Sequence, residues 1–136
     1  MRRWLLMAAL QLVLTMALVG CSGNPFKSLS ILSVTVIPDE LPPEGGQVQI
    51  TVEATRGDSA SARVSRYGDW LFASFTVRLS EVIAIDFEKK RWKGTIDLPS
   101  NRTPKDQRYI IVITVWEDYR RDQRIKEVIV RASGSS

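Results

Sequence analysis

Residues 47–54 (QVQITVEA) alternate polar and apolar side chains without interruption. Successive side chains of a β-strand point to opposite faces, so this period of two predicts a strand with one face in a core and the other in water. The apolar side chains all fall on one face: Val48, Ile50, Val52 and Ala54. A strand with a single dry face is typical of an antiparallel sheet, so this segment constrains the fold class more than any other.

The same period recurs along the chain from Ser30 onward. Further strands are predicted at 32–36, 62–67, 75–79, 92–98, 109–116 and 125–132. The 109–116 segment is apolar on both faces apart from Thr114, which favours a central place in the sheet. The 82–87 segment is apolar but ambiguous in its facing, and 118–123 is expected to be a polar turn. Seven or eight short strands with near-regular turns predict an all-β sandwich or small barrel.

Two blocks of the sequence resemble bacterial immunoglobulin-like domains. The segments that carry the likeness are 33–38 (SVTVIP), 41–42, 45–54, 92–101 (WKGTIDLPSN) and 109–115. The first three are similar to the first two strands of these domains, and the last two are similar to their late strands. The resemblance implies an immunoglobulin-like antiparallel β-sandwich of about seven or eight strands. It also implies the tyrosine-corner role of that fold for Tyr109.

The N-terminal segment has the order of a secretory signal peptide. Two arginines form a short basic region, residues 4–19 are apolar except at two positions, and small residues follow. Residues 18–21 (LVGC) resemble the lipobox of bacterial lipoproteins. The resemblance implies that a helical signal peptide, 1–20, is cleaved and that Cys21 carries a lipid. An uncleaved membrane helix is the alternative, but its apolar run is near the lower limit for spanning a bilayer.

Four segments follow from these observations. They are a signal peptide (1–20), a lipidated cysteine with a short tether (21–29), the sandwich domain (30–132) and a disordered tail (133–136). The eight tether residues after the cysteine span at most about 28 Å, which keeps the domain close to the membrane. Ser22 follows the cysteine. An Asp at this position would resemble the signal that retains lipoproteins in the inner membrane. We therefore expect a location in the bacterial cell envelope, on the outer membrane if the cell has one and otherwise on the outer face of the cell membrane.

The composition removes the usual catalytic and metal chemistry. The chain has no histidine, and its one cysteine is assigned to the lipid. No carboxylates show the spacing of an acid–base pair, so no enzyme activity, cofactor or metal is predicted. Cleavage after residue 20 lowers the net charge from +4 to +2, because two arginines leave with the signal peptide. A charge this small in an exported protein does not indicate nucleic-acid binding.

Aromatic and arginine residues in the predicted turns are the candidates for partner binding. These residues are Tyr67, Trp70, Tyr119, Arg120, Arg121 and Arg124. Trp92 is in phase with Ile96 and Leu98 and is expected in the core, whereas Trp116 is expected to cover the opposite face of the sheet. Aromatics and arginine dominate interface hot spots. We therefore expect a lipid-anchored accessory module that binds an envelope protein. The alternative is a carbohydrate- or polyanion-binding module at the membrane surface.

Three short motifs have a structural interpretation beside a functional one. Residues 56–59 (RGDS) contain an integrin-like tripeptide but are predicted to be a turn. Residues 101–103 (NRT) match a glycosylation acceptor, which is usually idle in a bacterium. The basic run 89–93 (KKRWK) is expected to be a solvated loop, with contact to anionic headgroups as the alternative.

Overall fold

The computed structural model of the protein describes residues 28–83 and 89–134. These residues form eight strands: β1 (Ile31–Ile37), β2 (Glu40–Leu41), β3 (Gly46–Ala54), β4 (Ser59–Arg66), β5 (Phe75–Val82), β6 (Lys90–Leu98), β7 (Gln107–Glu117) and β8 (Arg120–Val130). Within these ranges no helix is long and apolar enough to cross a membrane. The all-β prediction is confirmed. Cys21, the predicted signal peptide and most of the ambiguous 82–87 segment lie outside the described residues.

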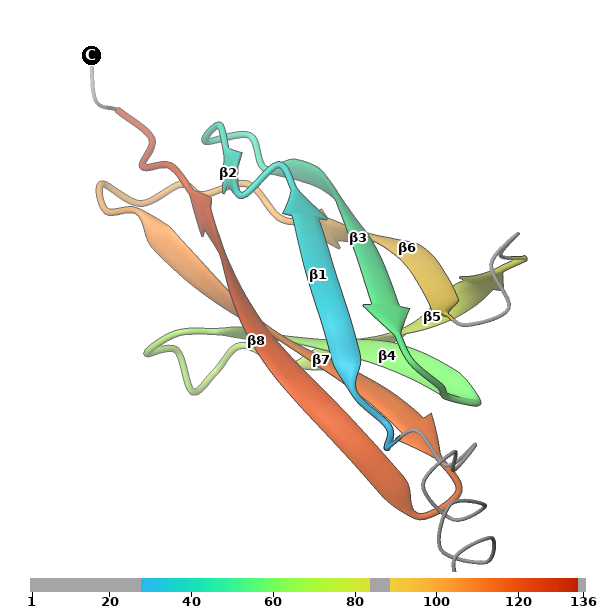
Figure 1. Ribbon diagram of the computed structural model, residues 1–136. Coiled ribbons are helices and arrows are strands. Elements are labelled where there is room, and N and C mark those ends of the chain that lie inside the picture. Colours follow the sequence, from blue (N-terminus) through green and yellow to red (C-terminus); the bar gives the residue numbers. More distant parts are fainter. Residues whose placement is uncertain (1–27, 84–88, 135–136) are drawn as a thin grey trace, which may run out of the picture.

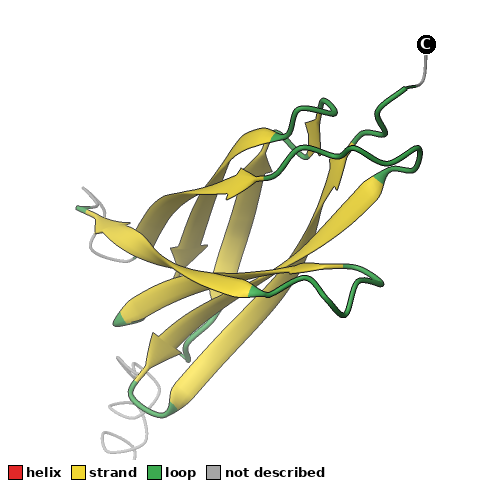
Figure 2. Cartoon of the chain, turned by 180° about the vertical axis from the view of Figure 1, so that it is seen from behind, coloured by secondary structure: helices red, strands yellow, loops and turns green. Residues whose placement is uncertain are grey.

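The strands are hydrogen-bonded into one curled sheet in the order β1–β3–β6–β5–β4–β7–β8–β2 (Figure 1). β5 joins the two halves of the curl because it changes partner along its length. Its residues 75–79 pair with β4, and its residues 80–82 pair with β6. Figure 2 shows from behind how the two halves cross each other. The predicted central position of 109–116 is confirmed, since β7 lies between β4 and β8.

The core lies inside the curl and is filled by the inward-facing side chains of both halves. The largest fully buried side chains include Trp92, Tyr109, Ile50, Ile96, Ile111 and Ile113. The alternation in residues 47–54 predicts its strand correctly, because all four of its apolar side chains are fully buried. The core position predicted for Trp92 is also confirmed. Each strand therefore places one face in the core, as its period of two requires.

The described chain begins beside the β7–β8 hairpin (Figure 1). The Ile31 amide donates a hydrogen bond to the Asp122 carboxylate at 2.8 Å, and Arg124 donates one to the Ile31 carbonyl at 3.2 Å. These side chains of β8 hold the first residue of β1 without a ladder between the two strands. The N-terminal end of the domain and the β7–β8 hairpin therefore share one end of the molecule.

Contacts of the folded part extend slightly beyond residues 30–132. Leu29 packs against the core, and the Ser28 carbonyl accepts a hydrogen bond from the Thr55 hydroxyl at 2.8 Å. At the other border, the Ser133 amide donates to the Thr103 carbonyl at 3.1 Å. Two residues assigned to the tether and one assigned to the tail thus contact the domain.

The predicted polar turn at 118–123 is wrong. A loop of only two residues, Asp118 and Tyr119, joins β7 to β8, which begins at Arg120. Asp118 has a positive φ of 53°, a conformation that lets a chain reverse within two residues. The polar residues after the loop continue to pair with β7. Their polarity reflects exposure to solvent and does not mark a break in the strand.

The short motifs serve the structure of loops. The turn predicted for 56–59 is confirmed for its first three residues, whereas Ser59 already opens β4. Gly57 is buried, and its carbonyl accepts a hydrogen bond from Lys90 at 2.8 Å. Asn101 is buried as well, and its amide donates to two backbone carbonyls at 2.7 and 3.1 Å. This side chain therefore organises the loop before β7.

Candidate functional site

The predicted partner-binding residues fall into two groups at opposite ends of β7. Tyr67 and Trp70 belong to the 67–74 loop between β4 and β5, and the Tyr67 amide donates to the Arg108 carbonyl near the start of β7 at 2.8 Å. Tyr119 and the three arginines belong to the β7–β8 hairpin at the other end. Eleven residues of strand span about 35 Å, so the two groups do not form one site.

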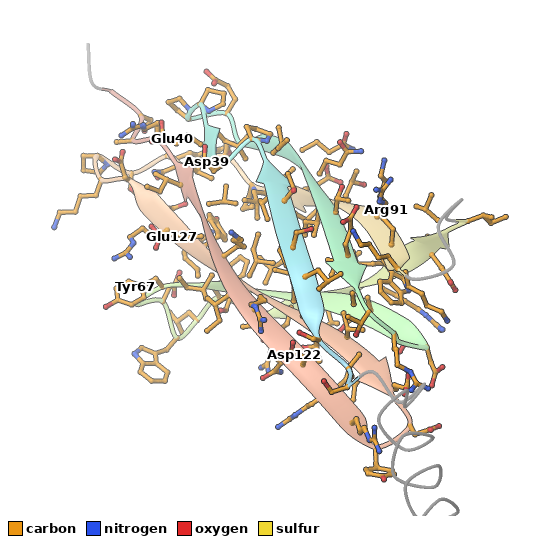
Figure 3. All side chains as sticks on the ribbon, in the orientation of Figure 1. Asp39, Glu40, Tyr67, Arg91, Asp122 and Glu127 are labelled. Atoms are coloured by element: carbon orange, nitrogen blue, oxygen red, sulfur yellow. The ribbon has the colours of Figure 1, made fainter. Side chains whose placement is uncertain are left out.

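The hairpin residues differ in how they are bonded. Tyr119 is 87% exposed, and the Arg120 guanidinium lies 5.8 Å from its ring centroid. Arg121 lies over a tryptophan of β7, whereas Arg124 donates to the Asp122 carboxylate at 3.0 Å. Partial burial alone would raise the pKa of Asp122, but hydrogen bonds from backbone amides and from Arg124 hold it below its ordinary value. Arg124 and Asp122 therefore hold the start of β1. Figure 3 shows Asp122 well separated from Tyr67, which belongs to the other group.

The 67–74 loop exposes three large side chains. Trp70 is 99% exposed, Leu71 is 96% exposed and Tyr67 is 65% exposed. Figure 3 shows Tyr67 at the left edge of the molecule, beside Glu127. The backbone under these side chains is bonded: the Asp69 amide donates to the Arg66 carbonyl at 3.3 Å, and the Leu71 amide donates to the Asp69 carboxylate at 3.0 Å. The loop therefore presents apolar surface to solvent from a fixed backbone.

Arg66, the last residue of β4, ties this loop to the core. Its Nε and Nη2 donate to the Tyr109 hydroxyl at 3.1 and 2.8 Å, and its Nη1 donates to Asp69 at 2.9 Å. The guanidinium also lies over the rings of Phe72 and Tyr109, at 4.5 and 5.3 Å from their centroids. Partial burial would lower the pKa of Arg66, but the hydrogen bonds to Tyr109 and Asp69 raise it. The Leu71 amide and Arg66 together hold the pKa of Asp69 below its ordinary value.

The tyrosine-corner role expected for Tyr109 is wrong. In that motif the hydroxyl bonds to a backbone group a few residues upstream. Here the hydroxyl accepts from Arg66 and donates to the Gln107 side chain at 3.4 Å, and these are its partners among the described residues. The register explains the difference, because it places Arg66 directly opposite Tyr109. The ring fills the core, while the hydroxyl supports the 67–74 loop.

A cleft of about 510 Å³ lies between this loop and the outward side of β4 and β7. Its lining includes Arg63, Ser65, Asp69, Trp70, Ser74 and Val112. Arg63 donates to the Ser74 hydroxyl at 3.3 Å. Such a lining combines an aromatic face, a cation and hydroxyls, which suits a polar side chain of a partner or a sugar ring. Among the described residues, no group of three or more Cys, His, Asp or Glu is placed to hold a metal ion.

Sequence reasoning missed three residues of this site. Leu71 follows Trp70 within a turn-like stretch, and that exposed apolar pair is a signal that could have been used. Arg63 interrupts a strand of small residues, which marks it as outward-facing once the strand is recognised. Arg66 had no local signal, because its partner Tyr109 lies 43 positions away along the chain.

Comparison with known proteins gives little further information. No protein-family model matches the sequence, and no curated protein matches it significantly. One similar solved structure is the NMR structure of a protein from Bacteroides thetaiotaomicron. The two chains share 11% identity over 81% of this chain and 94% of the other, with a TM-score of 0.38. A likeness this slight carries no functional inference.

Proposed function

We propose that this protein is a non-catalytic, lipid-anchored module of a bacterial cell envelope that binds another envelope protein through the 67–74 loop. One observation carries the proposal: Trp70 and Leu71 are almost fully exposed on a loop that Arg66 bonds to the core. A side chain presented from a fixed backbone loses little conformational entropy on binding. Tryptophan and arginine are also the residues that most often dominate interfaces.

The proposed anchor is a lipid on Cys21, added after cleavage of residues 1–20. The lipobox-like residues 18–21 support it. Several acyl chains hold a protein durably, because each buried methylene contributes about 0.8 kcal/mol. The described chain starts beside the β7–β8 hairpin, at the end of the domain opposite the 67–74 loop. A partner would therefore meet the loop on the side away from the anchor.

We further propose that the curled sheet is a variant of the immunoglobulin-like sandwich. The support is the pairing of β5, which pairs first with β4 and then with β6. It thereby links two groups of strands that pack around one core. The short sequence blocks that resemble bacterial immunoglobulin-like domains agree with this assignment. An experimental structure that shows two facing sheets would test it.

Photo-crosslinking in the native cell tests the proposed function. A photoreactive phenylalanine analogue at Trp70 in the full-length chain should form an adduct with one defined protein. The same analogue at Thr35, an exposed position on β1, is the matched control and should form none. Equal adducts at both positions, or no protein adduct at Trp70, would contradict the proposal.

Glycan binding is the second candidate, and the cleft beneath Trp70 favours it. An exposed indole beside hydroxyls of Ser65 and Ser74 has the composition of a sugar-stacking subsite. Retention of the full-length protein on an envelope polysaccharide, lost on Trp70→Ala and retained on Tyr119→Ala, would favour this function. A protein adduct at Trp70 without such retention would exclude it.

A further inference from the structure

The outward face of β5, β4, β7 and β8 forms a continuous surface with an apolar centre. Register places the outward side chains of the four strands beside one another: Arg63 beside Val112, and Val112 beside Ile125. We call this surface the outward face. Its apolar members are Ile110, Val112, Trp116, Ile125 and Ile129. Ile125 is 68% exposed and Trp116 is 37% exposed, so the centre is open to solvent.

The other half of the sheet gives an internal comparison. The outward side chains of β3 and β6 are polar or charged: Gln47, Gln49, Thr51, Glu53, Arg91, Lys93, Thr95 and Asp97. Both groups of strands bury their inward faces in the same core. β1, at the edge of that half, exposes Leu32 and Ile37 (49% and 61% exposed). On the outward face the apolar side chains instead lie beside one another on two paired strands, β7 and β8. Contiguous exposed apolar surface of this kind marks interaction sites.

The charge of the outward face is unbalanced. Its cations are Arg63, Arg78, Arg108 and Arg121, and its one carboxylate is Glu127. Glu127 accepts two hydrogen bonds from Arg108, at 2.9 and 2.7 Å, which neutralises that arginine. Within the described residues, no carboxylate pairs with the other three arginines. Arg63 bonds to a serine, and Arg121 lies over the Trp116 ring at 5.7 Å from its centroid.

We propose that the outward face binds the acidic surface of a protein partner. The proposal rests on the proposed function only in taking the partner to be a protein. The apolar centre would exclude water. Arg63, Arg78 and Arg121, which have no carboxylate partner in the described part of the chain, would meet Asp or Glu side chains around it. The face is continuous with the cleft under Trp70, because Arg63 and Val112 line both. One partner therefore contacts the loop and the face together.

Zero-length crosslinking with a carbodiimide tests the proposed contacts between the arginines and the partner's carboxylates directly. The full-length chain carrying Arg63→Lys, Arg78→Lys and Arg121→Lys keeps its charge and gains amines that a carbodiimide couples to adjacent carboxylates. In native membranes, these three positions should link to Asp or Glu residues of another protein. The native Lys126, whose register partner Ile111 is a buried inward residue, is on the opposite side of β8 and should not. Yields should fall as salt rises from about 0.05 to about 0.5 M, because screening weakens exposed ion pairs.

A charge-removal series supplies the second measurement. In a chain with the photoreactive analogue at Trp70, the triple variant Arg63→Gln, Arg78→Gln and Arg121→Gln should lower the protein adduct about five-fold or more. The matched triple Lys89→Gln, Arg102→Gln and Lys126→Gln should leave it unchanged. Both variants should keep the circular dichroism spectrum of the parent, which separates lost binding from lost folding.

The outcomes separate this proposal from the function on which it rests. An unchanged adduct in the arginine triple, or carbodiimide links only from Lys126, would overturn the acidic-partner proposal and leave the loop function standing. Absence of any adduct at Trp70 would overturn the loop function, and the carbodiimide links would still decide the face. Binding to phosphatidylglycerol vesicles that is lost in the arginine triple, without links to protein, would assign the face to lipid and refute the proposal.

Discussion

The substitution Tyr109→Phe removes one oxygen and so isolates the contribution of the Arg66 anchor. The phenyl ring keeps its place in the core, while Arg66 loses hydrogen bonds of 3.1 and 2.8 Å. A hydrogen bond to a charged group contributes about 1.5–3 kcal/mol. The Arg66 side chain is 20% exposed and keeps its bond to Asp69, so water replaces part of the loss. We expect the free energy of unfolding to fall by about 2 kcal/mol.

Urea unfolding of a soluble form beginning at Ser22 measures this change. With a denaturant slope of about 1–3 kcal/mol per molar, the midpoint should fall by about 1 M. Exchange of the Leu71 amide with solvent should also accelerate, because the bond from this amide to Asp69 depends on a carboxylate that Arg66 holds in place. In the full-length chain, the crosslinking yield at Trp70 should fall with the loss of a fixed loop.

Tyr67→Phe is the matched control for this experiment. It removes the same atom from a tyrosine that is 65% exposed and stacks with Arg108 through its ring, which the change retains. We expect stability within about 0.5 kcal/mol of the parent, as for most surface substitutions. If Tyr109→Phe is as harmless as Tyr67→Phe, or if it destabilises the protein without altering Leu71 exchange, the argument for an Arg66-anchored loop is refuted.

Three further predictions follow from single residues. Cys21→Ser should abolish labelling by palmitate, and persistent labelling would exclude Cys21 as the lipid site. Gly57→Ala should lower stability by about 2–5 kcal/mol, since φ is +148° and a Cβ would lie 2.5 Å from Val115, whereas Gly68→Ala, with φ +73° and open space, should cost about 1–2 kcal/mol; equal urea midpoints would contradict this. The pKa of Asp122 is lower in the folded protein than its ordinary value of 3.8, so the ionised carboxylate stabilises the fold at pH values above 3.8. This stabilisation is lost as the pH falls through the lowered pKa of the folded state. The stability difference between the parent and Asp122→Asn should therefore be smaller at about pH 3 than at about pH 6, and an unchanged difference would refute the assignment.

The strands were predictable wherever one face of a strand is buried and the other is wet. Residues 47–54 are the clearest example, because their buried and exposed positions alternate in step with their apolar and polar side chains. The prediction was wrong at the start of β8, where Arg120 and Arg121 lie in a strand that is exposed to solvent. The polar composition of this segment is typical of a turn, which is why a turn was predicted. The two-residue loop that the structure has instead depends on the positive φ of Asp118, and the sequence there lacks the typical Asn-Gly pair of such loops.

The site was predictable only in part, and the reason is distance along the chain. Tyr67 and Trp70 stand out because they are aromatic residues in a polar stretch, and the structure places them on one loop. The same reasoning grouped Arg124 with them, although Arg124 bonds to the start of β1. Local sequence also gives no indication that Arg66 meets Tyr109, because strand register decides which distant residues lie opposite each other.

The position of β1 determines how the domain would bear a mechanical load. If the protein is held at its N-terminus and a partner pulls on the 67–74 loop at the other end, the force on β1 runs along the strand. The hydrogen bonds between β1 and β3 join pairs from Ile31 to Ile37 and lie across that direction. They would be loaded together in shear rather than broken one after another as in unzipping. The same placement that puts the 67–74 loop far from the first residues of β1 therefore also gives the domain a strand geometry suited to resisting tension.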